Sequence, residues 1–122
     1  MYVLEGEIGA RIGDEVLHAA KGSYVFKPRG VSHTFWNEQD ERAVVMHILS
    51  PGGFEEYFAD LHRLIPAGGQ PDFDRVTRLA AKYGVTFQLD WVPDLEKRFG
   101  VSVYGRGPLE IPAQKKNRRP KQ

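Results

Sequence analysis

The chain lacks cysteine, a long apolar run and any large excess of charge of one sign, and each absence excludes a class of protein. Without cysteine there is neither a disulfide framework nor thiol chemistry, which fits a reducing compartment. No apolar stretch approaches the roughly 20 residues of a transmembrane helix, and no signal peptide is visible. A net charge of +1 over 122 residues predicts neither nucleic acid nor membrane as a partner. We therefore expect a cytoplasmic protein with one compact domain.

The most informative stretch of the sequence is residues 22–37, GSYVFKPRGVSHTFWN. Residues 23–27 are aromatic and β-branched, which predicts a strand. Pro28 fixes φ near the value of a turn and Gly30 accepts a positive φ, so the chain is expected to turn here. Residues 31–36 then predict a second strand, so this stretch is a strand, a tight turn and a strand.

Alternation along the second of these strands gives its two faces. His33 and Phe35 share one face, whereas Thr34 and Trp36 share the other. The pattern predicts that His33 lies beside an aromatic ring in the interior of a barrel or sandwich. The aromatic residues predicted to line a pocket there, with core packing as the alternative, are Tyr24, Phe26 and Phe35.

The first fifty residues predict an all-β structure, because short apolar stretches alternate with turns rich in Gly, Pro and Asp. The predicted strands are residues 1–4, 8–12, 16–19, 23–27, 31–36 and 42–49. The last of them, RAVVMHIL, is apolar on both faces, so the sequence leaves two positions open for His47. It either lines the pocket, where its near-neutral pKa would suit acid–base chemistry, or lies on the surface. His18 precedes a turn and is expected to be exposed.

Beyond residue 50 the apolar period becomes helical. It predicts helices over residues 54–65, over 72–83 with Asp72 as the N-cap, and over 93–99, with 85–91 extended. The expected organisation is a β-barrel over residues 1–50, a helical tail over 51–104 that packs on the barrel, and a disordered basic tail over 105–122. A solvated tail is the simplest interpretation of QKKNRRPKQ, with a nucleic-acid or targeting patch as the alternative.

The spacing within residues 22–37 resembles the second of the two sequence motifs of the cupin superfamily. The positions that match are Gly22, Pro28, Gly30, His33 and Asn37. The resemblance implies a small β-barrel of the double-stranded β-helix or jelly-roll type. It also implies that His33 is one ligand of a metal at the centre of the barrel. The alternative is an inert, hydrogen-bonded histidine in the interior.

The first cupin motif consists of an H-x-H pair, a glutamate and a glycine seven residues after the glutamate. Gly6 matches that glycine, which puts the glutamate one position before Met1 and the histidines earlier still. A small closed barrel also needs about eight strands, more than the six predicted here. We therefore expect a barrel that is incomplete at its N-terminus, with Met1 internal to a longer protein. The alternative is a shortened protein that pairs its open edge with a partner, and either way we expect a homodimer.

The segments PGGFEEYF and KYGVTF resemble the helical tail of single-domain cupins of the quercetin-dioxygenase-like type. In a full-length form, this resemblance implies a metal-dependent dioxygenase with Fe, Mn, Ni, Cu or Zn; no cofactor is assured in the chain as it stands. One alternative is a non-catalytic module that binds a small molecule or dimerises without a metal. Another is a sugar isomerase or epimerase with His33 or His47 as the base, for which the sequence suggests no carboxylate or lysine partner.

Overall fold

The computed structural model describes residues 1–65 and 72–101, so the predicted basic tail over 105–122 lies outside the described residues. The chain begins with five strands and continues with helices, which confirms the predicted all-β region and helical C-terminal region. In chain order the elements are β1 (Tyr2–Glu5), β2 (Glu7–Ile12), β3 (Glu15–Ala20), β4 (His33–Trp36), β5 (Val44–Met46), α1 (Glu55–Leu64), α2 (Phe73–Lys82), the 3₁₀ turn η1 (Leu89–Trp91) and α3 (Val92–Phe99). No helix in this part of the chain is long and apolar enough to cross a membrane.

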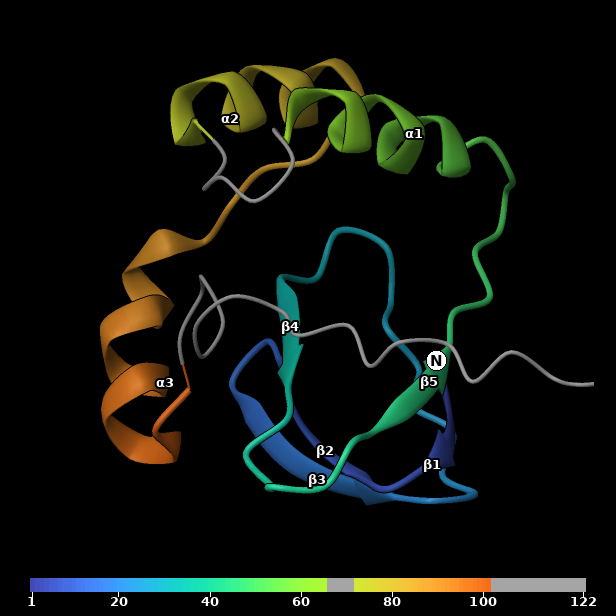
Figure 1. Cartoon of the computed structure of the whole chain (residues 1–122), viewed down its shortest axis with the longest axis vertical. Coiled ribbons are helices and arrows are strands. Elements are labelled where there is room, and N and C mark those ends of the chain that lie inside the picture. Colours follow the sequence, from blue (N-terminus) through green and yellow to red (C-terminus); the bar gives the residue numbers. More distant parts are fainter. Residues whose placement is uncertain (66–71, 102–122) are drawn as a thin grey trace, which may run out of the picture.

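The strands form two small antiparallel sheets that face each other in the lower half of Figure 1. One sheet has the order β1-β5 and the other the order β3-β2-β4. Their facing sides bury a shared apolar core, because alternate residues of each strand point to the same side. The buried members of this core are Met1, Val3, Ile8, Ala19 and Val25. We call this side of each sheet the inner face and the opposite side the outer face.

The prediction of a strand over residues 23–27 is wrong. This segment runs extended along β1 but forms only an isolated bridge between Tyr24 and Tyr2. The Val25 amide donates to the carbonyl oxygen of Met1 at 2.7 Å, at the very end of β1. Phe26 and Lys27 lie outside the strands of the described residues.

Aromatic side chains of η1 and α3 pack on part of the outer face of the β3-β2-β4 sheet. Trp36 packs directly on Gly9 of β2, where an added Cβ would lie 2.3 Å from the indole ring. The ring of Phe99 in α3 packs on Trp36 with its centroid at 4.7 Å, and the guanidinium of Arg11 lies 3.8 Å from the ring centroid of Trp91. The prediction of an extended segment over 85–91 is wrong for Leu89–Trp91, which form the 3₁₀ turn that places this indole.

Helices α1 and α2 pack mainly against each other and lie apart from the sheets at the top of Figure 1. The Tyr83 hydroxyl, at the end of α2, donates to Asp60 Oδ2 of α1 at 2.6 Å. This hydrogen bond is the main reason why the pKa of Tyr83 is raised to about 12. The predicted cap of α2 is confirmed, since the Asp72 carboxylate accepts from the amides of Asp74 and Arg75.

Candidate small-molecule site

Glycines and an asparagine hold the turns that bring the strands together. Gly6 has a φ of 72°, and a Cβ there would lie 2.9 Å from the Arg42 carbonyl oxygen, so only glycine fits between β1 and β2. Gly22 and Gly30 also have positive φ and flank the segment that contains Pro28. Asn37 closes the turn after β4, since its Nδ2 donates to the carbonyl oxygen of Glu41 at 2.8 Å.

His33 and Phe35 lie on the inner face of β4. The register pairs His33 with Ile12 and Phe35 with Ala10, and paired residues point to the same side of an antiparallel sheet. The predicted shared face is therefore correct, but both side chains are exposed at this open side of the sandwich instead of being enclosed. The Nδ1 of His33 donates to the Val31 carbonyl oxygen at 3.0 Å, which leaves Nε2 free to meet a ligand.

His47 and Lys27 meet beside Phe35. Lys27 Nζ lies 3.2 Å from His47 Nδ1, and the centroid of the Phe35 ring lies 5.1 Å from the His47 ring and 5.4 Å from Lys27 Nζ. The expectation that His47 has no lysine partner is therefore wrong. We call Lys27, His33, Phe35 and His47 the inner cluster.

The electrostatics of the inner cluster are positive. Burial lowers the pKa of Lys27. The pKa of His47 is lowered first by burial and then by the charges of Lys27, the N-terminal amino group and His33. Of these causes, the charge of His33 has the smallest effect. At neutral pH His47 is therefore uncharged, and its Nδ1 accepts a hydrogen bond from the Lys27 ammonium group, so its Nε2 carries the ring hydrogen.

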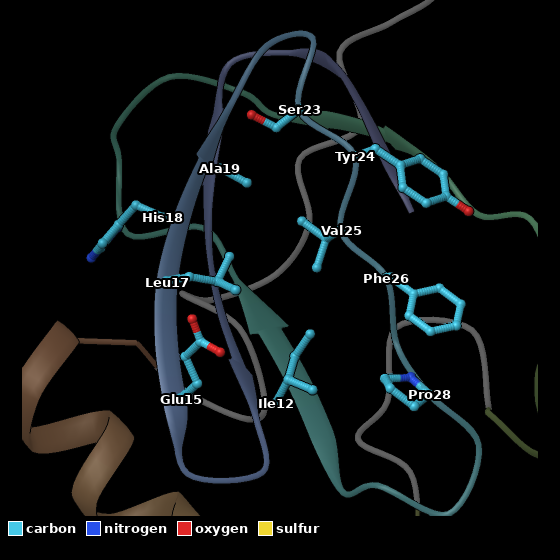
Figure 2. Close-up of a pocket in the computed structure, with 10 residues that line it drawn as sticks. All are labelled: Ile12, Glu15, Leu17, His18, Ala19, Ser23, Tyr24, Val25, Phe26 and Pro28. Atoms are coloured by element: carbon cyan, nitrogen blue, oxygen red, sulfur yellow. The ribbon is translucent and has the colours of Figure 1, made fainter.

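A cavity of about 490 Å³ lies between the β2–β3 hairpin and the segment over residues 23–28. Its lining residues are Ile12, Glu15, Leu17, His18, Ala19, Ser23, Tyr24, Val25, Phe26 and Pro28. Figure 2 shows Val25 pointing towards Leu17 and Ile12, whereas Tyr24 and Phe26 point to the other side of the segment. The cavity and the inner cluster adjoin, because Ile12 pairs with His33.

The structure places the predicted pocket residues on two sides of the segment. Tyr24 and Phe26 belong to the cavity wall, but their side chains are 59% and 69% exposed. Phe35 and His47 lie together in the inner cluster. The sequence analysis missed Lys27, although it follows Val25 by two positions and so shares its side. The sequence pattern favoured the aromatic residues Tyr24 and Phe26, whereas the side chains on the inner side of the segment are Val25 and Lys27.

The side chains of the inner cluster do not fit a metal site of the type that the cupin motif implies. Within residues 1–65 and 72–101 no group of three or more histidine, cysteine or acidic side chains could hold a metal ion. The cluster supplies two imidazoles, and one of them has Lys27 at Nδ1 and therefore a hydrogen at Nε2. A positive group in contact with a ligand would also oppose a second cation.

The side chain of His18 points to the outer face (Figure 2) and is exposed, as predicted. Its Nδ1 lies 3.1 Å from Glu38 Oε1, and the other carboxylate oxygen of Glu38 accepts from Trp36 Nε1 at 3.4 Å. Glu38 thereby connects β3 to the end of β4. Its position in a polar turn gave no sign of this role.

The comparison with protein families gives one match, the cupin domain, over residues 1–49. Residues 1–49 are a cupin domain. All four members of the inner cluster fall within it, whereas the three α-helices follow the matched region. The comparisons with curated proteins and with solved structures gave no match. The cupin fold of the β-region is thus established, and the match does not extend to a dioxygenase specificity.

Proposed function

We propose that the cupin domain binds a small organic molecule on its inner face, between the inner cluster and the apolar cavity. The observation that carries this proposal is the convergence of Lys27 and His47 beside the exposed ring of Phe35. Small-molecule sites typically combine apolar walls with a few polar groups that set orientation. Here the apolar wall is supplied by Ile12, Leu17 and Val25 and the polar groups by the inner cluster.

The proposal is tested by recording heteronuclear NMR spectra of the protein with a panel of small ring compounds of each charge. We expect at least one compound to shift the signals of Phe35 and His47 at millimolar concentration. Phe35→Ala should remove that binding, because it deletes the apolar surface next to the polar groups. Phe58→Ala is the matched control, since Phe58 is an exposed phenylalanine of α1. If no compound shifts the inner cluster, the proposed function is wrong.

A second candidate function is proton transfer, as in the isomerases and epimerases considered from the sequence. The Lys27–His47 distance of 3.2 Å favours it, because two titratable groups in contact can pass a proton between them and to a substrate. A panel of aldoses and ketoses in deuterated water would reveal the reaction as deuterium uptake next to the carbonyl. Unchanged uptake in His47→Gln would count against it.

Metal-dependent dioxygenase chemistry in a full-length form, with Fe, Mn, Ni, Cu or Zn, stays a prediction from the family resemblance. Equilibrium dialysis against zinc and nickel, followed by elemental analysis, tests it directly. One ion per chain, lost in His33→Ala, would favour a metal site. If His33→Ala retains the ion as well as the unsubstituted protein does, the ion binds at another site.

The homodimer expected from the sequence likewise stays a prediction. The outer face of the β1-β5 sheet and its neighbouring segment support it, because Tyr24, Phe26 and Met46 are exposed together there. Contiguous apolar surface of this kind is often covered by another chain. Light scattering at micromolar concentration should give the dimer mass, and Phe26→Glu should shift it to the monomer.

A further inference from the structure

We propose that the ligand of the inner cluster is an aromatic carboxylate, with its carboxylate on Lys27 and His47 and its ring against Phe35. This inference rests on the proposed function and names the chemical class of the molecule bound. It follows from three properties of the cluster, namely its charge, its free hydrogen-bond donors and its exposed aromatic surface.

The charge of the cluster is positive without a compensating carboxylate. In the described part of the chain, no ion pair joins Lys27 or His33 to an acidic side chain, although other lysines and arginines have such partners. Among the charged groups that act on His47, Lys27 has the largest effect, and its ammonium charge is positive. A bound anion would therefore meet the positive charge of Lys27, with which no acidic side chain of the described residues forms an ion pair.

The free donors of the cluster match a carboxylate. The ammonium group of Lys27 has three hydrogens and gives one to His47 Nδ1 at 3.2 Å, which leaves two. His47 keeps a hydrogen on Nε2, because its Nδ1 is the acceptor. A carboxylate has two oxygens that only accept hydrogen bonds, and such charge-assisted bonds are the strong ones. A neutral or cationic group would leave these donors without a comparable partner.

The aromatic surface of Phe35 supplies the second half of the recognition. Its ring is 43% exposed on the inner face. The ring centroid lies 5.1 Å from that of His47 and 5.4 Å from Lys27 Nζ. A ligand whose carboxylate meets Lys27 therefore has its apolar part next to Phe35. Aromatic rings pair favourably in offset or edge-on contact and bury substantial area.

The cavity also sets the direction in which the ligand lies. Glu15 is the acidic residue among the described lining side chains, and the register places it on the far side of Ile12 from His33. A carboxylate is repelled from that end and attracted to Lys27. Glu15→Gln should therefore leave the binding mode unchanged and raise the affinity for an anion slightly.

The test measures four probes by NMR titration or calorimetry: benzoate, benzamide, acetate and benzylamine. Benzoate combines the ring and the carboxylate, benzamide has the ring without the charge, acetate has the charge without the ring, and benzylamine reverses the charge. We expect benzoate to bind at least about tenfold more tightly than each of the others, as expected for one charge-assisted contact.

Substitutions at Lys27 locate the carboxylate. Lys27→Gln should weaken benzoate binding at least about tenfold and leave benzamide binding unchanged, because only the charged donor is lost. Lys27→Arg should retain the preference for benzoate over benzamide. The matched control is Lys21→Gln, an exposed lysine in the turn after β3, which should change neither.

The outcomes separate this inference from the proposed function. If benzamide or benzylamine binds as tightly as benzoate at the inner cluster, the small-molecule site stands and the carboxylate inference is overturned. If acetate equals benzoate, the aromatic part is overturned. If none of the four probes nor any compound of the wider panel binds, both fail. Because the comparison of probes uses the unsubstituted protein, the result does not depend on whether a variant folds.

Discussion

The two faces of β4 carry aromatic residues of similar size in very different surroundings. Trp36 on the outer face is 8% exposed, because Gly9 lies beneath it and Phe99 of α3 covers it. Phe35 on the inner face is 43% exposed and has two polar neighbours, Lys27 and His47. Adjacent residues of one strand thus serve stability on one side and, in our proposal, recognition on the other.

This difference shows which face of the sheet contributes more to the stability of the described chain. Phe99 of α3 and Trp91 of η1 pack their rings on part of the outer face of the three-stranded sheet. The inner face carries the apolar core and, next to it, the exposed and positively charged inner cluster. Stability and binding can then be altered separately, which the following substitutions test.

The largest expected effect is on the outer face. Trp36→Ala should lower the free energy of unfolding by about 3–5 kcal/mol, because it empties a site filled by a buried indole. Phe35→Ala should cost at most about 1 kcal/mol, since its ring is already half in water. Urea unfolding followed by circular dichroism measures both. Equal losses would show that the two faces contribute alike to stability.

Gly9→Ala should destabilise the protein by about 1–3 kcal/mol through overpacking against the Trp36 indole. The added Cβ would lie 2.3 Å from the ring, and either the ring or the β2–β4 ladder has to move. Gly52→Ala is the control, because nothing lies within 4 Å of a Cβ at that position. Thermal unfolding of the two variants gives the comparison, and a stable Gly9→Ala would contradict the close packing described.

A smaller loss is expected from Arg11→Ala, about 0.5–1 kcal/mol for a cation–π contact near the surface. The guanidinium lies 3.8 Å from the Trp91 centroid and attaches the 3₁₀ turn to β2. The fluorescence of Trp91 should also change, which would distinguish loss of this contact from a general effect. Arg29→Ala, an exposed arginine in the turn before β4, should change neither quantity.

The smallest effect on stability is expected at the inner cluster and depends on pH. The pKa of His47 should lie below its ordinary value of 6.5. The unfolded chain then binds this proton at a higher pH than the folded chain does. The stability that His47 contributes is therefore present above pH 6.5 and is lost as the pH falls towards the lower folded value.

A histidine NMR titration measures that pKa directly. Lys27→Gln should move the pKa of His47 back towards 6.5 without reaching it, because burial, the larger cause, remains. Lys21→Gln should leave it unchanged. A pKa of His47 at or above its ordinary value would contradict the positive character of the inner cluster.

Much of the fold was predictable from local pattern. The positive-φ turn at Gly30, the cap at Asp72 and the helical periods after residue 50 are local properties, and all appear in the structure. The strand over 23–27 was overpredicted because a strand needs a partner along its whole length. Residues 23–27 form only the bridge from Tyr24 to Tyr2, and pairing between distant segments is decided by the tertiary structure.

The candidate site was predictable only in part. Alternation correctly placed His33 and Phe35 on one face, since it depends on the strand alone. It left open which face of residues 42–49 points inward, because both faces are apolar. The contact of His47 with Lys27 joins residues 20 positions apart, and it decided that question.

By itself the sequence determined a β-region with a cupin motif, a following helical region and His33 beside Phe35 on one face, because periodicity, turn chemistry and motif spacing are local. Only the tertiary structure decided that Lys27 and His47 meet there, that Glu38 joins His18 to Trp36, and that Phe99 of α3 packs on Trp36. These contacts depend on how the two sheets and the last helix pack. Packing selects among faces that the sequence pattern leaves equivalent.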